Sequence, residues 1–166
     1  MTDQLVRAYY DQEAADYHRH YDGTPGDYPA NHIRLDLVLR RIEALRLDHD
    51  QLEGTYAVAG RPWRVYEIGC GEGTPLLRML ERGWAVGGCD LSPAMVALAR
   101  DQLHAVLYDP AAVQWGDVEL GVDAPGDAWD VVIATGVLPH LTRPAALFEE
   151  AHRLLRPGGT LLVEFR

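Results

Sequence analysis

Three glycines at alternate positions are the first residues in this sequence whose spacing indicates chemistry. Gly69, Gly71 and Gly73 follow the run VYEI and precede Thr74-Pro75, a pair typical of a helix start. Glycine in such a turn permits positive φ angles and lets a ligand approach the backbone closely. The free amides at the start of the following helix favour an anionic group. The turn is therefore predicted to bind a ligand between a strand and a helix.

An acidic residue further along the chain strengthens this interpretation. Asp90 lies 21 residues after Gly69, at the end of a second apolar run, where a carboxylate can accept hydrogen bonds from both hydroxyls of a ribose. The glycines are spaced G-x-G-x-G, one residue shorter than the dinucleotide fingerprint, and Glu72 would bring negative charge to a pyrophosphate. We therefore expect a nucleoside-containing ligand other than NAD or FAD. A tight turn followed by an exposed acid is the alternative.

Histidine is the other candidate for chemistry. His140 follows the run DVVIA and is expected to face the mouth of a site at the strand ends, where it could take a proton from an attacking oxygen or nitrogen. A hydrogen bond to nearby backbone is the alternative role. His18 and His20 form an H-x-H pair whose side chains would point in different directions on a helix. No metal site is predicted.

The elements that must position these residues alternate between strands and helices. Short apolar runs predict strands at 63–68, 85–89, 113–115, 130–134 and 160–165. Helices are predicted from Thr74, from Ser92 and over 144–155, with Thr74 and Ser92 as caps. This alternation indicates a Rossmann-like, doubly wound α/β fold with about five mostly parallel strands and helices on both faces. Ligands of such sheets bind at the carboxyl ends of the strands.

Helical patterns also precede the first strand. Residues 3–21 have helical composition, residues 31–47 place apolar side chains at helical spacing, and turn residues at 22–27 separate them. Residues 54–62 are a connector by composition. We therefore expect one domain over residues 1–166, with a helical lead-in over 1–60 and a Rossmann-like core over 61–166.

Composition limits the class of protein. The net charge of −10 argues against a nucleic-acid partner. No apolar run approaches the roughly 20 residues of a membrane span, and the N-terminus does not resemble a signal peptide. Two cysteines, Cys70 and Cys89, suit a reducing compartment, so a cytoplasmic protein without a membrane partner is expected. Five acidic residues are predicted to form a solvent-exposed face, and one of them is expected to have a role in function. They are Asp117, Glu119, Asp123, Asp127 and Asp130.

The order of the motifs resembles the class I S-adenosylmethionine-dependent methyltransferases that act mainly on small molecules. The matching segments are, in order, YYDQEAADYHRHYD, VYEIGCGEG, CDLSPAMVALAR, GDV, WDVVIATGVLPHL and LLRPGGTLLVEF. The resemblance covers nearly the whole chain. The sheet of this family usually continues with two more strands and a helix, so the core over 61–166 is expected to lack the usual last strands.

The resemblance implies S-adenosyl-L-methionine as the cofactor and a role for each matching position. The glycine turn would contact its methionine part, through Gly69, Cys70, Gly71 and Gly73, with Glu67 near the amino group and Thr135 close by. Asp90 would hold the ribose. The adenine would meet Leu91, Asp117 and Val118, and Trp115 and Trp129 would pack against the sheet or the adenine edge. Tyr10 and Tyr17 would close over the cofactor, and His140 is the candidate catalytic residue.

The predicted function is S-adenosylmethionine-dependent methyl transfer to a small-molecule acceptor. The reaction is an in-line displacement, so positioning and desolvation would be the protein's main tasks. The alternative is a non-catalytic cofactor-binding module or fragment that acts through a partner chain. The strand at 160–165 would leave one edge unpaired, which predicts a homodimer through that edge. An N-terminal segment folded over the edge is the other possibility.

Overall fold

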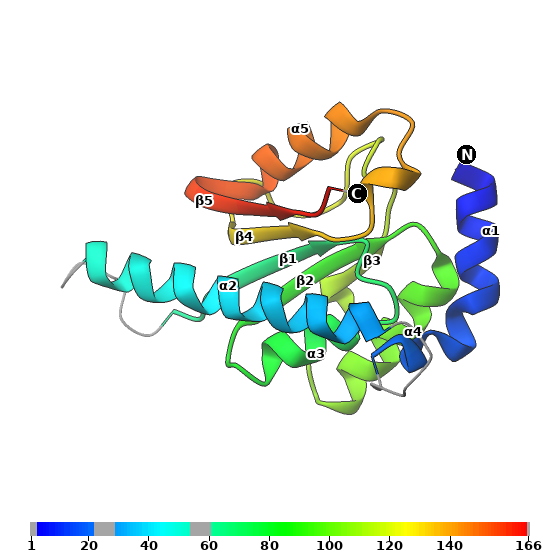
Figure 1. Ribbon diagram of the computed structural model, residues 1–166, viewed down its shortest axis with the longest axis horizontal. Helices are drawn as coiled ribbons and strands as arrows, with labels where there is room; N and C mark the ends of the chain where they lie inside the picture. Colours follow the sequence, from blue (N-terminus) through cyan, green and yellow to red (C-terminus); the bar gives the residue numbers. More distant parts are fainter. Residues whose placement is uncertain (1–2, 22–28, 54–60, 166) are drawn as a thin grey trace.

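A parallel sheet in the order β3-β2-β1-β4-β5 forms the centre of the protein (Figure 1). The computed structural model describes residues 3–21, 29–53 and 61–165. Its strands are β1 (Arg64–Ile68), β2 (Ala85–Asp90), β3 (Val113–Trp115), β4 (Trp129–Ala134) and β5 (Leu155–Val163). Each pair of neighbours is parallel, which confirms the predicted Rossmann-like α/β fold.

Helices cover both faces of the sheet, as Figure 1 shows. One face packs against three helices, α2 (Pro29–Glu53), α3 (Thr74–Leu80) and α4 (Pro93–Ala105). The other face packs against α5 (Pro144–Leu154) and the segment 118–124. Ahead of α2 lie α1 (Asp3–Glu13) and the 3-10 helix η1 (Ala14–His20), and two 3-10 turns, η3 (Pro110–Ala112) and η4 (Leu138–His140), connect later elements. No described helix is both long enough and apolar enough to cross a membrane.

The central strands β1 and β4 follow apolar runs because helices cover both faces of the sheet and bury their side chains. All six residues of β4 are buried, and so are four of the five residues of β1. Helix α4 begins as predicted, with Pro93 in its first turn and the Ser92 hydroxyl accepting a hydrogen bond from the Met95 amide at 3.1 Å.

The predicted cap of α3 is wrong. Gly73 occupies the N-cap position with a φ of 97°, and Thr74 is already the first helical residue. The Thr74 amide donates instead to Oε1 of Glu72 at 3.3 Å. Glycine takes the cap because the chain must enter the helix in a left-handed conformation that threonine adopts poorly.

Several boundaries differ from the prediction. The fifth strand spans 155–163 rather than 160–165, because pairing with β4 begins at Leu155 and resumes at Thr160 across an irregularity in register. Helix α2 extends beyond the predicted 31–47 at both ends. The loop predicted at 22–27 and most of the connector at 54–62 lie outside the described residues.

The predicted solvated acidic face is wrong at two of its members. Asp130 is 1% exposed and accepts hydrogen bonds from Arg61 at 2.6 Å, Arg156 at 2.5 Å and the Arg64 amide at 2.8 Å. Glu119 is also buried. Burial alone would raise the pKa of Asp130, but the hydrogen bonds from the arginines and the amide outweigh it and hold that pKa below its usual value.

This cluster generates a stability prediction. Asp130→Ala should lower the free energy of unfolding at pH 7 by about 2–4 kcal/mol, because it leaves two arginines without their shared carboxylate. The loss should shrink as the pH falls below about 4, since a carboxylate with a lowered pKa stabilises the fold only while it is ionised. Urea unfolding followed by tryptophan fluorescence measures both effects.

The matched control is Asp36→Ala, which removes the partner of Arg40 from an exposed pair on α2. That change should cost less than about 0.5 kcal/mol. Equal effects of the two substitutions would contradict the structural role given to Asp130.

Candidate active-site pocket

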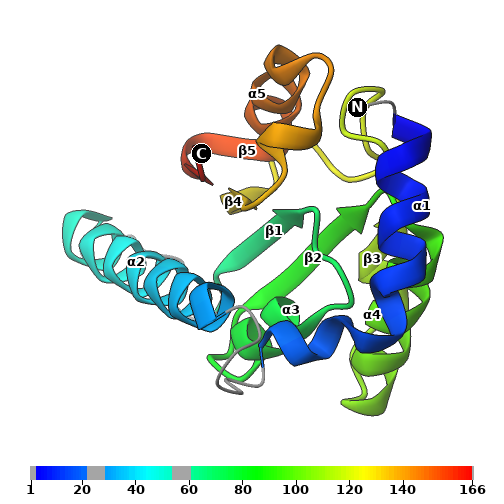
Figure 2. The ribbon, with the colours of Figure 1, turned by 45° about the vertical axis from the view of Figure 1, so that its right-hand side comes forward.

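A cavity of about 420 Å³ lies at the carboxyl ends of the strands, beneath α1 and η1. Figure 2 shows α1 beside the ends to which the arrows of β1 and β2 point. The volume falls within the roughly 300–1,000 Å³ of pockets that hold small ligands. The position agrees with the rule that parallel sheets bind ligands where the strand order reverses, here between β1 and β4.

The glycine turn forms the floor of this pocket. Gly69 and Gly71 have φ angles of 75° and 54°, and both line the cavity. The amides of Gly69 and Cys70 donate to the Cys89 carbonyl at 2.8 and 3.0 Å, which ties the turn to the end of β2. A Cβ on Gly69 would come within 2.6 Å of Val137 Cγ2. Only glycine therefore fits there without closing the floor.

Asp90 lies at the end of β2 and faces the cavity. Its two carboxylate oxygens accept hydrogen bonds from the Gly71 amide at 2.8 Å and the Ser92 amide at 2.9 Å. Burial raises the pKa of Asp90, although the bonds from Ser92 and Gly71 counteract part of that shift. A carboxylate oxygen has two lone pairs, so each oxygen keeps acceptor capacity for hydroxyl groups in the cavity.

Two helices, α1 and η1, cover the pocket; we call residues 3–20 the lid. On one side, Asp11 accepts the Ser92 hydroxyl at 2.5 Å and thereby docks the lid on the start of α4. On the other side, the Tyr10 hydroxyl lies 3.1 Å from His140 Nε2. Tyr17 lies over the glycine turn, since a Cβ on Gly71 would stand 3.4 Å from its ring.

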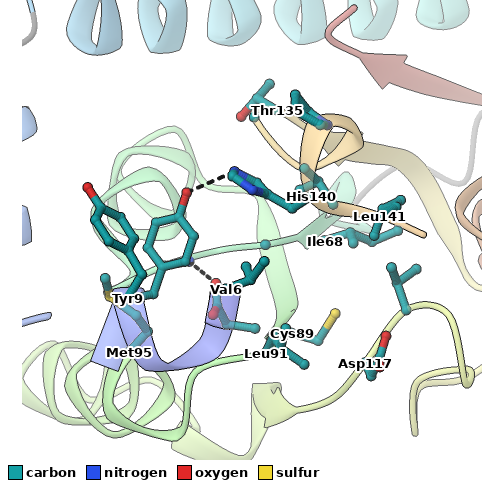
Figure 3. A pocket seen from close by; sticks show the side chains of 18 of the residues that line it. Val6, Tyr9, Ile68, Cys89, Leu91, Met95, Asp117, Thr135, His140 and Leu141 are labelled. Atoms are coloured by element: carbon teal, nitrogen blue, oxygen red, sulfur yellow. Dashed lines mark hydrogen bonds between the residues drawn. The ribbon is translucent and has the colours of Figure 1, made fainter. Parts of the chain in front are cut away.

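His140 is at the end of η4, on the opposite side of the pocket from Tyr9 (Figure 3). Burial lowers the pKa of its imidazole, so the ring is neutral at pH 7. Within the described part of the chain, its buried Nδ1 has no hydrogen-bond partner. The site therefore presents a neutral imidazole that can accept a proton.

A buried carboxyl group and an arginine lie close to each other beside the turn. Glu67 is 4% exposed, and its Oε2 has no hydrogen-bond partner among the described residues. Burial raises the pKa of Glu67 to about 8, and Arg34 opposes that shift. Arg34 lines the pocket and pairs with Glu164 at 3.0 Å, and the same Glu164 oxygen accepts the Gly136 amide.

The wall beyond Asp90 contains Asp117, Val118 and Glu119. The Asp117 carboxylate accepts the Glu119 amide at 2.8 Å. Glu119 in turn accepts the Thr142 hydroxyl at 2.9 Å and also bonds to the Arg143 amide. This carboxylate thus links the wall beyond β3 to the loop that follows His140.

Most of the residues predicted for the site meet in this one pocket. They are Tyr10, Tyr17, Gly69, Gly71, Asp90, Leu91, Asp117, Val118, Thr135 and His140. Three others do not line it. Cys70 is buried in the core on the helix α3 side, Gly73 packs on Ala99 of α4, and Glu67 is covered as described above.

Both predicted tryptophans are outside the pocket. Trp115 is 56% exposed, and its indole N–H donates to the Leu91 carbonyl at 2.9 Å. Trp129 packs against Tyr66 on the sheet. Both cysteines are free and buried. Among the described residues, no three His, Cys, Asp or Glu side chains lie together in a way that could hold a metal ion.

The sequence analysis missed Arg34, His20 and the turn at Gly136–Val137, all of which line the pocket. Arg34 stands between Ile33 and Leu35 of α2, but Asp36 and Arg40 follow within six residues, so the local sequence does not single it out. The H-x-H pattern of His18 and His20 gives no indication that His20 lines a pocket. Nothing in the local sequence indicates that Gly136 and Val137 reach the glycine turn.

A methyltransferase domain model matches residues 66–161 of this chain. Among curated proteins, the ubiquinone biosynthesis O-methyltransferase of Pseudomonas aeruginosa is 35% identical over 103 residues, which cover 60% of this chain and 43% of that protein. The enzyme of the same name from Alkalilimnicola ehrlichii is 34% identical over 126 residues, covering 75% and 49%. The matched part spans about half the length of these curated relatives.

Solved structures share the fold. The 4+2 cyclase SpnF superimposes with a TM-score of 0.70 and 25% identity, covering 98% of this chain and 60% of that one. Phosphoethanolamine N-methyltransferase 2 of Haemonchus contortus, solved in complex with S-adenosyl-L-methionine, gives a TM-score of 0.64 at 22% identity and covers 92% of this chain and 32% of that one.

The covered carboxyl of Glu67 generates a pH-dependent prediction. Glu67→Gln should match the wild type in stability near pH 5 and exceed it increasingly up to pH 8, by about 1.4 kcal/mol per pH unit. A carboxyl group whose pKa is raised in the folded state binds its proton more tightly there, so the wild type loses stability as the pH rises. Urea unfolding at several pH values measures the difference.

The control is Glu81→Gln, whose side chain is 61% exposed at the end of α3. Its effect should not vary with pH over this range. A Glu67→Gln difference that stays constant from pH 5 to pH 8 would show that Glu67 is already ionised in the folded protein.

Proposed function

The chain belongs to the methyltransferase-domain family, and from that premise we propose that it transfers a methyl group from S-adenosyl-L-methionine to a small-molecule acceptor. The observation that carries this proposal is the junction of Asp90 with the glycine turn, where the Gly71 amide and the Asp90 carboxylate share a hydrogen bond at the pocket floor. The relatives named as O-methyltransferases support a hydroxyl group as the acceptor.

The residues of the pocket fit this cofactor. A ribose needs an acceptor of two hydrogen bonds, which Asp90 supplies at the end of β2. An amino acid end needs an acceptor for its ammonium group and a positive partner for its carboxylate, and Glu67 and Arg34 lie near each other beside the turn. A bound ammonium group would favour the ionised form of Glu67. The unpartnered Oε2 of Glu67 is a buried acceptor that an ammonium group, directly or through water, would satisfy. Asp117, Leu91 and Val118 would surround the adenine.

In the proposed mechanism the lid excludes water and His140 accepts a proton. The bound cofactor supplies a methyl group on a cationic sulfur, which a nucleophile displaces in line. The lid excludes water, and the pocket orients the acceptor toward that methyl group. An acceptor hydroxyl that bonds to His140 Nε2, in place of the Tyr10 hydroxyl, would pass its proton to the imidazole as its oxygen forms the new bond to carbon.

A second function has one specific observation in its favour. The chain is 25% identical to SpnF, which is described as a 4+2 cyclase. The alternative proposal is therefore a cofactor-binding module or fragment that does not transfer the methyl group and acts through a partner chain. Formation of S-adenosylhomocysteine in the presence of phenolic acceptors separates the two functions.

We further propose that this protein is cytoplasmic and that it associates with a second copy of itself along β5. Support for the compartment comes from the two free, buried thiols. Support for the dimer comes from β5, which pairs only with β4 among the described strands, and from an apolar groove between this strand and α2. Ile33 and Leu37 of that groove are 54% and 62% exposed.

The role of His140 can be tested by substitution. His140→Gln should lower kcat for a phenolic acceptor by roughly 10²–10⁴-fold and leave the Kd of the cofactor unchanged, because the base acts on the acceptor. In the wild type, activity should fall as the pH drops and the imidazole becomes protonated. Steady-state kinetics across pH and calorimetry with S-adenosylhomocysteine provide the two readouts.

The control is His104→Gln, in the last turn of α4 and away from the pocket. It should leave kcat unchanged. If His140→Gln retained full kcat with a phenolic acceptor, His140 would not be the base.

The dimer can be tested by light scattering at increasing protein concentration. We expect the wild type to show the mass of two chains at micromolar concentration and Leu37→Glu to show the mass of one, because a charge would lie in the apolar groove. Leu47→Glu places the same charge at an exposed position of α2 that does not line the groove. A wild type that stays monomeric would disprove the contact.

A further inference from the structure

Three tyrosine rings of the lid contact one another in sequence above the pocket. Tyr9 and Tyr10 meet edge to face with ring centroids 5.1 Å apart, and Tyr10 lies 6.1 Å from Tyr17. Across the pocket, Tyr10 also meets the His140 ring at 5.6 Å. We call Tyr10, Tyr17 and His140 the aromatic wall. All three side chains line the cavity.

The wall extends over the part of the pocket between the glycine turn and His140. At one end the Tyr17 ring covers Gly71, and at the other the Tyr10 hydroxyl contacts His140 Nε2 at 3.1 Å. Asp90 is close enough for its charge to affect both tyrosines. Tyr10 and Tyr17 are therefore positioned to contact a ligand that binds between the glycine turn and Asp90.

The rings of the wall carry no net charge at pH 7. Burial is the main cause that raises the pKa of Tyr10 and of Tyr17, and burial lowers the pKa of His140. A neutral phenol ring has a negative electrostatic potential on its face, which attracts a cation within about 6 Å. One face of the Tyr17 ring is stacked on His20, with ring centroids 4.4 Å apart, and the Arg34 guanidinium lies near both tyrosines. The wall itself carries no positive charge, so its uncovered ring surface can attract a cation.

We infer that the aromatic wall selects the charged form of the cofactor, so that Tyr10 and Tyr17 favour a sulfonium over the neutral thioether that methyl transfer leaves. This inference rests on the proposed function, because it assumes that S-adenosyl-L-methionine is the ligand. During transfer the bond from sulfur to the methyl carbon breaks and its electron pair stays on sulfur, while an acceptor lone pair forms the new bond. Sulfur loses its charge, and the acceptor proton goes to His140.

The consequence is a change in lid affinity at each turnover. Before transfer, the positive charge lies at the sulfur and draws the tyrosine rings onto the ligand. After transfer, that charge is gone and a proton has arrived on His140, at the other end of the wall. The attraction between the lid and the ligand is then weaker, which favours release of the product.

The test compares two ligands in the same variants. Calorimetry gives the Kd of S-adenosyl-L-methionine and of S-adenosylhomocysteine, and the quantity of interest is the ratio of the two. Tyr10→Leu or Tyr17→Leu should reduce the preference for the sulfonium by roughly 2- to 30-fold relative to the wild type, the range of one cation–π contact of about 0.5–2 kcal/mol. Tyr10→Phe and Tyr17→Phe should preserve the wild-type ratio.

Leu91→Ala is the matched control, since it changes a pocket side chain without a ring. It should weaken both ligands by the same factor. Fluorinated phenylalanines at position 17 provide a second series that keeps the shape of the ring while reducing its negative face, and the preference should fall stepwise with the number of fluorine atoms.

The outcomes are distinct. If the leucine variants weaken both ligands equally and fluorination has no effect, the tyrosines only close the pocket and the inference is wrong. If the wild type binds neither ligand, the proposed function itself fails. A ratio that falls in the leucine and fluorinated variants but not in the phenylalanine variants supports charge selection.

Discussion

The hydrogen bond from the Gly71 amide to Asp90, at 2.8 Å, is the contact on which the rest of the pocket depends. It joins the turn after β1 to the end of β2, and the amides of Gly69 and Cys70 reinforce the junction at the Cys89 carbonyl. The left-handed φ angles of the glycines make the close approach possible. Because the junction is made of backbone groups and one carboxylate, the pocket floor is fixed by the sheet and not by flexible side chains.

The lid uses the same end of the sheet. Asp11 docks on Ser92, two residues after Asp90, so the helix that covers the pocket is attached next to the residue that forms its floor. Tyr10 reaches the opposite side at His140. The two contacts place α1 across the mouth of the pocket, in agreement with its position in Figure 2.

Short sequence patterns predicted the structural features that depend on interactions between residues close in the sequence. The Ser92-Pro93 start of α4 and the apolar run of β4 depend mainly on neighbours within a few residues, and the glycines at 69 and 71 mark a turn by their own conformational freedom. Apart from the cap of α3, where Gly73 replaces Thr74, the errors concern residues whose partners are distant in sequence. Asp130 is buried because Arg61 and Arg156 come to it from other segments, 69 and 26 residues away. The pairing of Arg34 with Glu164 and that of Tyr10 with His140 each span 130 residues, and no short pattern encodes them.

Glu119 has a consequence for how this scaffold could acquire new specificities. Its carboxylate fixes Thr142 and Arg143, just beyond the loop that carries Val137, Pro139 and Leu141 into the pocket. Pro139, the exposed member of the three, can therefore vary while both ends of the loop remain anchored, by β4 at one end and by Glu119 at the other, whereas Val137 packs against the glycine turn. Such a loop is a natural site for mutational libraries, since changes there would alter the acceptor half of the cavity while the junction at Asp90 remained intact. In this fold the variable position lies in the loop after β4, and the constant positions lie in the junction between the glycine turn and Asp90.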